Sequence, residues 1–262
     1  MIPKNVLMLF LFLAFTLVPA WAIQADEGEG TVALPHDFGN EDLEAFFEAE
    51  EVYDPLESMN RVFFQVNDKL YFWILKPVNT AYTAVVPIDF RECFGNFFDN
   101  VAAPVRVVNN LLQGKFADAG IDFSRFMINS TAGVLGFGDP ALRSFGLEPK
   151  SEDFGQTLGV WGIGEGPYLC LPIFGPLTLR DTVGFTGDSL AHPATYVLSK
   201  PLEGAAYYSA DKVNLLSLNP DLYEDMKRYS LDPYISMRQV YLDYRRDKIL
   251  DRAVKNEMIH QL

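Results

Sequence analysis

The sequence predicts an all-α protein built as one large domain, with a glycine- and proline-rich loop region in its middle. Apolar residues recur at helical spacing before residue 130 and again after residue 200, and no run of alternating strands interrupts them. Two Asp-Pro pairs, at Asp54 and Asp232, have the form of helix starts. Between Gly133 and Gly187 lie 12 of the 19 glycines, so this middle region is predicted to form loops.

The N-terminal segment, residues 1–22, has the pattern of a secretory signal peptide. Lys4 precedes an apolar run from Val6 to Val18, and Ala20–Ala22 fits the small-x-small cleavage rule. An uncleaved anchor is the alternative interpretation. Because the run is too short to cross a bilayer core of roughly 30 Å, cleavage after Ala22 is favoured.

Residues 23–53 are predicted to form an acidic, flexible arm. From Asp26 to Glu57 there are 12 acidic residues and no Lys or Arg, so most of the net charge of −14 lies there. No basic patch indicates a nucleic-acid partner. The two cysteines, Cys93 and Cys170, are compatible with one disulfide or with two buried thiols.

The first helix of the domain is expected from Asp54 to Leu75. Asp54 is predicted to cap it in a capping box with Glu57, and Pro77 is predicted to close it. One face is expected to pack into the core, namely Val62, Val66, Leu70 and Trp73.

Three further helices are expected before the loop region. The second covers residues 88–100, the third begins at Pro104 and is ended by Gly114, and the fourth covers residues 117–129. In the loop region, the phrases GVLGFGD and GVWGIGE are interpreted as close-approach turns rather than phosphate-binding loops.

After residue 200 the sequence predicts three more helices. One starts at Pro201, a short one follows Pro220, and a long charged one starts at Pro233 and runs to about Met258. Residues 251–262 are assigned to a C-terminal tail. The acidic residues of the last helix are interpreted as a solvated face.

The sequence offers little catalytic chemistry. His36, His192 and His260 have no ligand partners at metal-binding spacing, and no G-x-S-x-G motif is present. This inventory predicts no metal site, no cofactor and no enzyme, and it favours binding or transport.

Several phrases together carry a family resemblance: DPLESMNR, PVRVVNNLLQG, FGQTLGVWGIGEGPYLCLPIFGPLTLRD and DPYISMR. The chain resembles the VacJ-like (MlaA) proteins of the outer-membrane lipid asymmetry pathway. The resemblance implies a helical ring over residues 54–250 that encloses an amphipathic channel. It also implies that misplaced phospholipid passes from the outer leaflet to a soluble periplasmic carrier, with a trimeric porin as a further partner, and it implies no ATP and no metal.

One departure concerns attachment to the membrane. Typical members are lipoproteins, yet no cysteine follows the apolar run here, since the first is Cys93. The sequence therefore predicts an exported protein at the periplasmic face of the outer membrane without a lipid anchor. The alternative is a soluble periplasmic lipid-binding or scaffold protein that has lost its anchor.

The stretch LPIFGPLTLRD is the predicted wall of the lipid channel. A phospholipid path must be apolar for the acyl chains and charged where the headgroup passes. The predicted apolar residues are Leu171, Ile173, Phe174, Leu177 and Leu179, and the predicted charges are Arg180 and Asp181. Pro172, Gly175 and Pro176 are predicted to break the helix and form a hairpin turn. A buried turn with a structural Arg-Asp pair is the alternative.

Aromatic residues suggest a belt at a membrane–water interface, since Tyr and Trp rings are partly apolar and partly polar. The candidates are Tyr71, Trp73, Tyr82 and Trp161. Packing in the core is the alternative for each of them.

Overall fold

The computed structural model describes residues 54–198 and 200–260 of the chain. Within these residues two short strands form a hairpin, and all other regular elements are helical, so the predicted all-α class is confirmed. The elements are α3 (Glu57–Leu70), the π-helix η2 (Tyr71–Leu75), α4 (Lys76–Val85), α5 (Ile88–Leu112), α6 (Phe116–Thr131), α7 (Pro140–Phe145), α8 (Phe154–Val160), β1 (Tyr168–Leu171), β2 (Gly175–Thr178), α9 (Leu179–Ala191), α10 (Pro193–Val197), α11 (Pro201–Leu218), α12 (Leu222–Tyr229) and α13 (Pro233–His260).

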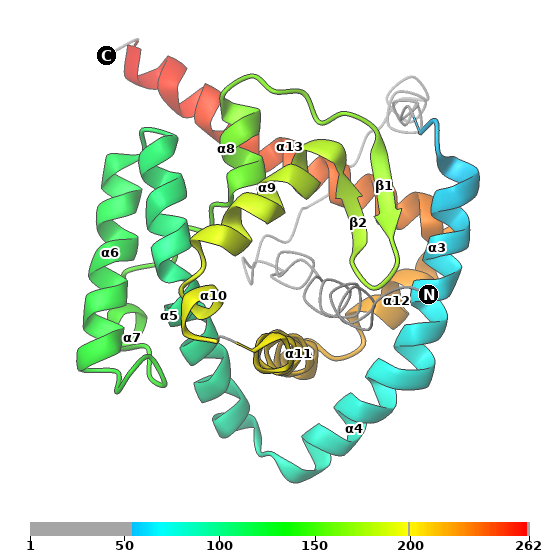
Figure 1. The fold of residues 1–262 in the computed structure, drawn as a ribbon. Helices are drawn as coiled ribbons and strands as arrows, with labels where there is room; N and C mark the ends of the chain where they lie inside the picture. Colours follow the sequence, from blue (N-terminus) through cyan, green and yellow to red (C-terminus); the bar gives the residue numbers. More distant parts are fainter. Residues whose placement is uncertain (1–53, 199, 261–262) are drawn as a thin grey trace, which may run out of the picture.

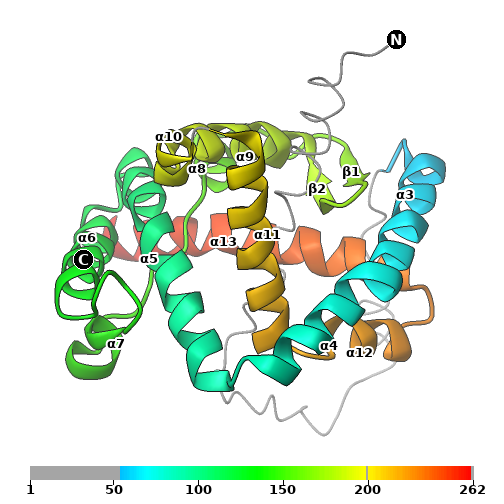
Figure 2. The same cartoon turned by 60° about the horizontal axis from the view of Figure 1, so that its bottom comes forward.

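The helices follow a closed circuit around α11. Figure 1 shows α3 on the right of this circuit, α4 at the bottom, α5 on the left and α9 with the hairpin at the top, while α11 is seen end-on inside it. Figure 2 shows α11 standing inside the circuit and the long α13 crossing behind it. This is the ring-like arrangement that the family resemblance implies. The helix α13 ends at His260 and so includes residues 251–260, which the sequence assigns to a C-terminal tail.

The predicted capping box at the start of the first helix is wrong. Helix α3 begins at Glu57, and its N-cap residue, Leu56, makes no side-chain cap. One oxygen of Asp54 accepts the Leu56 amide at 3.3 Å, but the other binds the Tyr234 hydroxyl and, at 3.1 Å, Arg238. Both of these partners lie on α13, so Asp54 joins the two ends of the domain instead of closing a capping box.

Pro77 does not close the first helix, contrary to the prediction. Proline has no N–H and would leave the carbonyl one turn earlier without a donor. The chain widens at this point into the π-helix Tyr71–Leu75, where the Lys76 amide donates to the Tyr71 carbonyl five residues earlier. The helical path therefore continues through α4 to Val85.

Pro104 lies inside a helix rather than at the start of one. Residues 88–112 form a single helix, α5, so the predicted second and third helices are one element. The neighbours of Pro104, namely Ala103 and Val105, are buried, and packing against α6 and α11 outweighs the cost of about 3 kcal/mol for a proline in a helix interior. Gly114 ends this segment with φ of +73°, as expected.

The predicted hairpin turn forms in the middle region. Strands β1 and β2 pair antiparallel, with Leu169 opposite Leu177. The connecting turn contains Ile173 and Gly175 at φ of +72° and +77°. The outer edge of β1 is covered by α3, where Asn60 and Asn67 bind its backbone.

The rest of the middle region is more ordered than predicted, because it contains four short or medium helices. Helices α8 and α9 cross where Gly155 meets Gly184, and a Cβ atom on Gly184 would overlap the Gly155 backbone. The phrase GVLGFGD forms a close-approach turn, as predicted: Gly136 has φ of +92°, and a Cβ there would lie 2.5 Å from Asn100.

The interior of the domain is polar and much of its surface is apolar. Among the described residues, 12 hydrophobic and 19 polar or charged residues are buried, whereas 35 large hydrophobic residues are exposed. The prediction of a packed face on the first helix is wrong, since Val62 and Val66 are 56% and 40% exposed. No helix in the described ranges is long and apolar enough to cross a bilayer.

Candidate functional site

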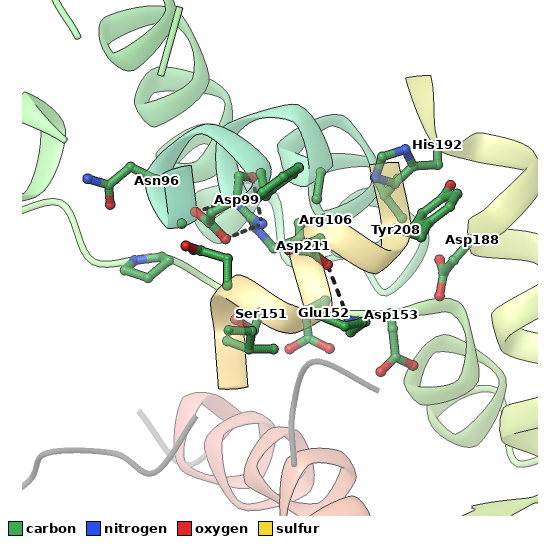
Figure 3. Close-up of a pocket in the computed structure, with 18 of the residues that line it drawn as sticks. Asn96, Asp99, Arg106, Ser151, Glu152, Asp153, Asp188, His192, Tyr208 and Asp211 are labelled. Carbon is green, nitrogen blue, oxygen red and sulfur yellow. Dashed lines mark hydrogen bonds and ion pairs between the residues drawn. The ribbon is translucent and has the colours of Figure 1, made fainter. Parts of the chain in front are cut away.

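A cavity of about 630 Å³ lies inside the circuit of helices. Its walls come from α5, α9, α11 and α13, from the start of α8 and from the segment 149–153. Apolar side chains such as Phe98, Leu177 and Leu215 share these walls with many charged ones. Figure 3 shows the charged and polar side chains converging from several elements.

Two of the wall's arginines are held by carboxylates. Arg106 binds Asp99 at 2.8 Å, about two turns earlier on the same helix. Arg125 binds Asp139 at 2.8 Å, and the Asn129 amide donates to the same carboxylate. Both arginines are nearly buried, so their charges depend on these partners.

Arg245 of α13 is the centre of a buried network at the cavity wall. Its guanidinium binds Asp181 at 2.6 Å and Asp153 at 2.9 Å, and the Tyr241 hydroxyl donates to Asp181. Burial raises the pKa of Asp153, but Arg245 outweighs this effect, so the pKa lies below its usual range. The network ties α13 to the starts of α8 and α9.

Asp188, on α9, differs from the other acids of the wall. It accepts the Phe154 amide at 2.9 Å and the Asn109 side chain at 2.8 Å. Burial, together with the negative charge of Asp153, raises the pKa of Asp188 to about 7. This carboxylate is therefore close to its titration point in neutral water.

The residues of the predicted channel wall fall in different places. Leu177 and Asp181 line the cavity. Arg180 is buried and binds its neighbour Asp181 at 3.5 Å and the Ile163 carbonyl at 3.4 Å, so this charge pair is part of the packed structure.

The other predicted wall residues do not belong to the cavity lining. Leu179 is 50% exposed on the outside of α9. Half-buried residues of the hairpin and its turn are Leu171, Pro172, Ile173, Phe174 and Gly175, and Pro176 is buried. The described structure thus brings two of the predicted apolar and charged wall residues to the cavity.

Most of the cavity's charged residues were missed by the sequence reasoning. The acidic residues of the last helix were interpreted as a solvated face, and Asp243 and Asp247 are exposed, but the sequence reasoning did not identify the buried Arg238, Tyr241 and Arg245 on the same helix. They occur at spacings of three and four residues, which is the helical signal that could have identified a buried polar face. Asp153 and Asp188 carry no local signal, because only the tertiary fold brings them together.

The four aromatic residues of the predicted interfacial belt divide into two pairs. Trp73 and Trp161 are 75% and 53% exposed. Tyr71 and Tyr82 are half-buried, and their hydroxyls bind Glu224 at 3.2 Å and Asn214 at 2.8 Å. The tryptophans are thus placed on the surface, while the tyrosines connect helices.

Both cysteines are free thiols in the structure. Cys170 is buried in the cluster formed with Tyr168, Tyr234 and Tyr241. Burial raises the pKa of its thiol to about 12, so it is protonated and unreactive at neutral pH.

The family model described as MlaA lipoprotein matches residues 52–248 of the chain. The chain is 35% identical over 192 residues to the intermembrane phospholipid transport system lipoprotein MlaA of Escherichia coli (strain K12), which covers 72% of this chain and 75% of that protein. The protein of the same name from Haemophilus influenzae is 29% identical over 201 residues, covering 76% and 80%.

The chain is also similar to a solved structure described as the structural basis for maintenance of bacterial outer membrane lipid asymmetry. The match has a TM-score of 0.68 and 32% identity, and it covers 76% of this chain and 100% of the other. Both named relatives are lipoproteins, which is at odds with the prediction of an unlipidated N-terminus. That prediction concerns residues 1–22, outside the described ranges, and it stays a prediction.

Proposed function

The chain belongs to the MlaA lipoprotein family, and on this premise we propose that it is the component of an intermembrane phospholipid transport system that maintains lipid asymmetry of the outer membrane. It acts as a conduit rather than as an enzyme. Misplaced phospholipid leaves the outer leaflet through the interior of the helical ring.

The distribution of apolar side chains is the observation that carries this proposal. The described residues place 35 large hydrophobic side chains on the surface and bury 19 polar or charged ones. A water-soluble domain of this size has the opposite preference, since Leu, Val and Phe are usually buried and Arg and Asp are not. An apolar exterior around a polar interior suits a protein embedded in one leaflet of a bilayer.

The lining of the cavity supports a transport function, because it contains contacts for the acyl chains and for the headgroup of a phospholipid. Leu177, Phe98 and Leu215 provide apolar contacts for acyl chains, and the charged side chains provide contacts for a headgroup. Its volume of about 630 Å³ accommodates a headgroup with part of the acyl chains.

A finer part of the proposal concerns the path and the partners. Of the segment 171–181, Leu177 and Asp181 are proposed to contribute to the wall of the path, because both line the cavity. A trimeric porin is proposed to hold the ring at the periplasmic face of the outer membrane, and a soluble periplasmic carrier is proposed to receive the lipid. The support for both partners is the family resemblance.

The alternative, a soluble periplasmic lipid-binding or scaffold protein, is not favoured. Such a protein would have to keep residues such as Trp73 and Val85, which are 75% and 80% exposed, in water. So many large apolar side chains in contact with water are unusual for a soluble protein.

The proposal is tested by measuring phospholipid on the cell surface. Cells that lack the chain are expected to expose more phospholipid to an externally added phospholipase than cells that contain it. Restoring the wild-type chain should reverse this increase. Equal surface phospholipid with and without the chain would overturn the proposed function.

A further inference from the structure

Asp188 forms no ion pair with a Lys or Arg among the described residues. Eight carboxylates line the cavity, and seven of them lie within 4.0 Å of a Lys or Arg nitrogen among the described residues. Asp188 has no such partner, and its hydrogen bonds come from the Phe154 amide and from Asn109. A carboxylate has sites for about four hydrogen bonds, so Asp188 keeps acceptor capacity for a donor in the cavity.

A second residue of the cavity wall has an acceptor atom without a donor. Gln156 lines the cavity and is 3% exposed, and its Oε1 atom has no hydrogen-bond partner among the described residues. Its Nε2 atom donates to Asp153 at 3.0 Å, which fixes the orientation of the amide. A buried acceptor without a donor is costly, and a small movement of the amide toward the cavity would let a ligand supply the donor.

Aromatic rings complete this part of the wall. His192 and Tyr208 both line the cavity, and their ring centroids are 5.6 Å apart. Burial lowers the pKa of His192, so the imidazole is neutral and does not repel a cation. The faces of such rings attract ammonium groups. Figure 3 shows Asp153, Asp188 and Tyr208 along this wall.

We propose that Asp188, with Gln156 and Tyr208, binds the ammonium group of an ethanolamine headgroup and so selects aminophospholipids over anionic phospholipids. This inference rests on the proposed function and names the substrate class of the same cavity. Five cationic side chains stand against the eight carboxylates of the wall, which disfavours a headgroup whose net charge is negative.

The test measures which lipid the purified chain retains. Wild-type protein in detergent is incubated with equal amounts of dioleoyl phosphatidylethanolamine and dioleoyl phosphatidylglycerol, re-isolated, and its bound lipid is quantified by mass spectrometry. The wild type is expected to retain the ethanolamine lipid in about tenfold excess, as for a hydrogen-bonded charge pair. Asp188→Asn should retain similar total lipid in a ratio near one.

Two further variants control for folding and charge. Asp188→Glu keeps the carboxylate and should keep the preference. Asp243→Asn removes a carboxylate from the exposed side of α13 and should also keep it. An unchanged preference in Asp188→Asn, or a wild-type ratio of one, overturns the inference and leaves the proposed function standing. Failure of the wild type to retain any phospholipid overturns the proposed function as well.

A measurement on the wild type alone keeps the inference falsifiable if Asp188→Asn does not fold. Soluble phosphoethanolamine should displace bound lipid at about one tenth of the concentration at which glycerol 3-phosphate does. Equal displacement by the two compounds overturns the inference.

Discussion

The side chain of Asn60 accepts the backbone N–H of Cys170 at 2.9 Å, and it thereby replaces a third strand at the free edge of the hairpin. Its amide group donates to the Tyr168 carbonyl at 3.0 Å and to Asp54 at 2.9 Å. Asn67, two turns later, binds the Leu171 carbonyl at 2.9 Å. Helix α3 thus provides hydrogen-bond partners for the free edge of β1 through two asparagine side chains.

This relationship predicts a large effect of Asn60→Leu. The substitution keeps the branched shape of the side chain but leaves buried backbone groups of β1 without partners, each at a cost of about 1–3 kcal/mol. We expect the free energy of unfolding to fall by about 3 kcal/mol in detergent denaturation. Gln65→Leu, on the exposed side of the same helix, is the control and should change it by less than about 0.5 kcal/mol. Equal effects would contradict the edge-capping role.

The adjacent arginines of α13 give a second matched pair. Arg245→Met leaves Asp153 without its cation and the buried Asp181 with Arg180 alone, so we expect a loss of about 3–5 kcal/mol in thermal or chemical unfolding. Arg246 binds Glu165 at 3.0 Å on the partly exposed side, and Arg246→Met should cost no more than about 1 kcal/mol. A similar loss in both variants would show that the Arg245 network is not a structural centre.

Asp188 predicts a pH dependence of stability. Its pKa is about 7 in the folded chain and 3.8 as an ordinary Asp, and the charged groups that act on it are Asp153 and Arg245. Because the folded pKa is raised, its stabilising effect is complete below pH 4 and is lost as the pH rises through 7.

Asp188→Asn should therefore raise the free energy of unfolding by about 2 kcal/mol at pH 8, after discounting for solvent screening, and by almost nothing at pH 3. Asp243→Asn should show no such difference between the two pH values. A variant that is less stable than the wild type at pH 8 would contradict the unpaired state of Asp188. A gain in stability with a loss of lipid preference is the combination expected of a binding residue.

The exposed apolar surface predicts membrane retention that salt does not weaken. Trp73→Asp combined with Val85→Asp should move a substantial fraction of the chain into the soluble fraction after a high-salt wash, whereas the wild type should stay with the membrane. The melting temperature in detergent should be unchanged, since both side chains are exposed. Retention of the double variant would show that these residues do not contact lipid.

Periodicity and turn chemistry were sufficient to predict most of the helices and the turn at Gly175. These signals failed where packing between elements distant in the chain determines the local structure. Pro77 and Pro104 are accommodated in helices by a π-helix and by buried neighbours, which no local signal reveals. The apolar face with Val66 was assigned to the core because helical periodicity identifies an apolar face without saying whether protein or lipid covers it.

The site was only partly predictable for a related reason. Leu177 and Asp181 were identified because one local phrase combines apolar and charged residues. Asp188 and Arg245 belong to helices that are ordinary in sequence, and their roles depend on contacts between elements distant in the chain. The set of residues that line the cavity could therefore be identified only from the folded structure.

The most direct test of the central claim, that phospholipid passes through the cavity, is photocrosslinking from position 177. A photoreactive phenylalanine analogue in place of Leu177 should acquire the mass of a phospholipid when membranes are illuminated, because Leu177 lines the cavity. The same analogue in place of Leu158, which is buried but does not line it, should acquire none. Lipid attached at the exposed position 73 but never at 177 would contradict a lipid path through the ring.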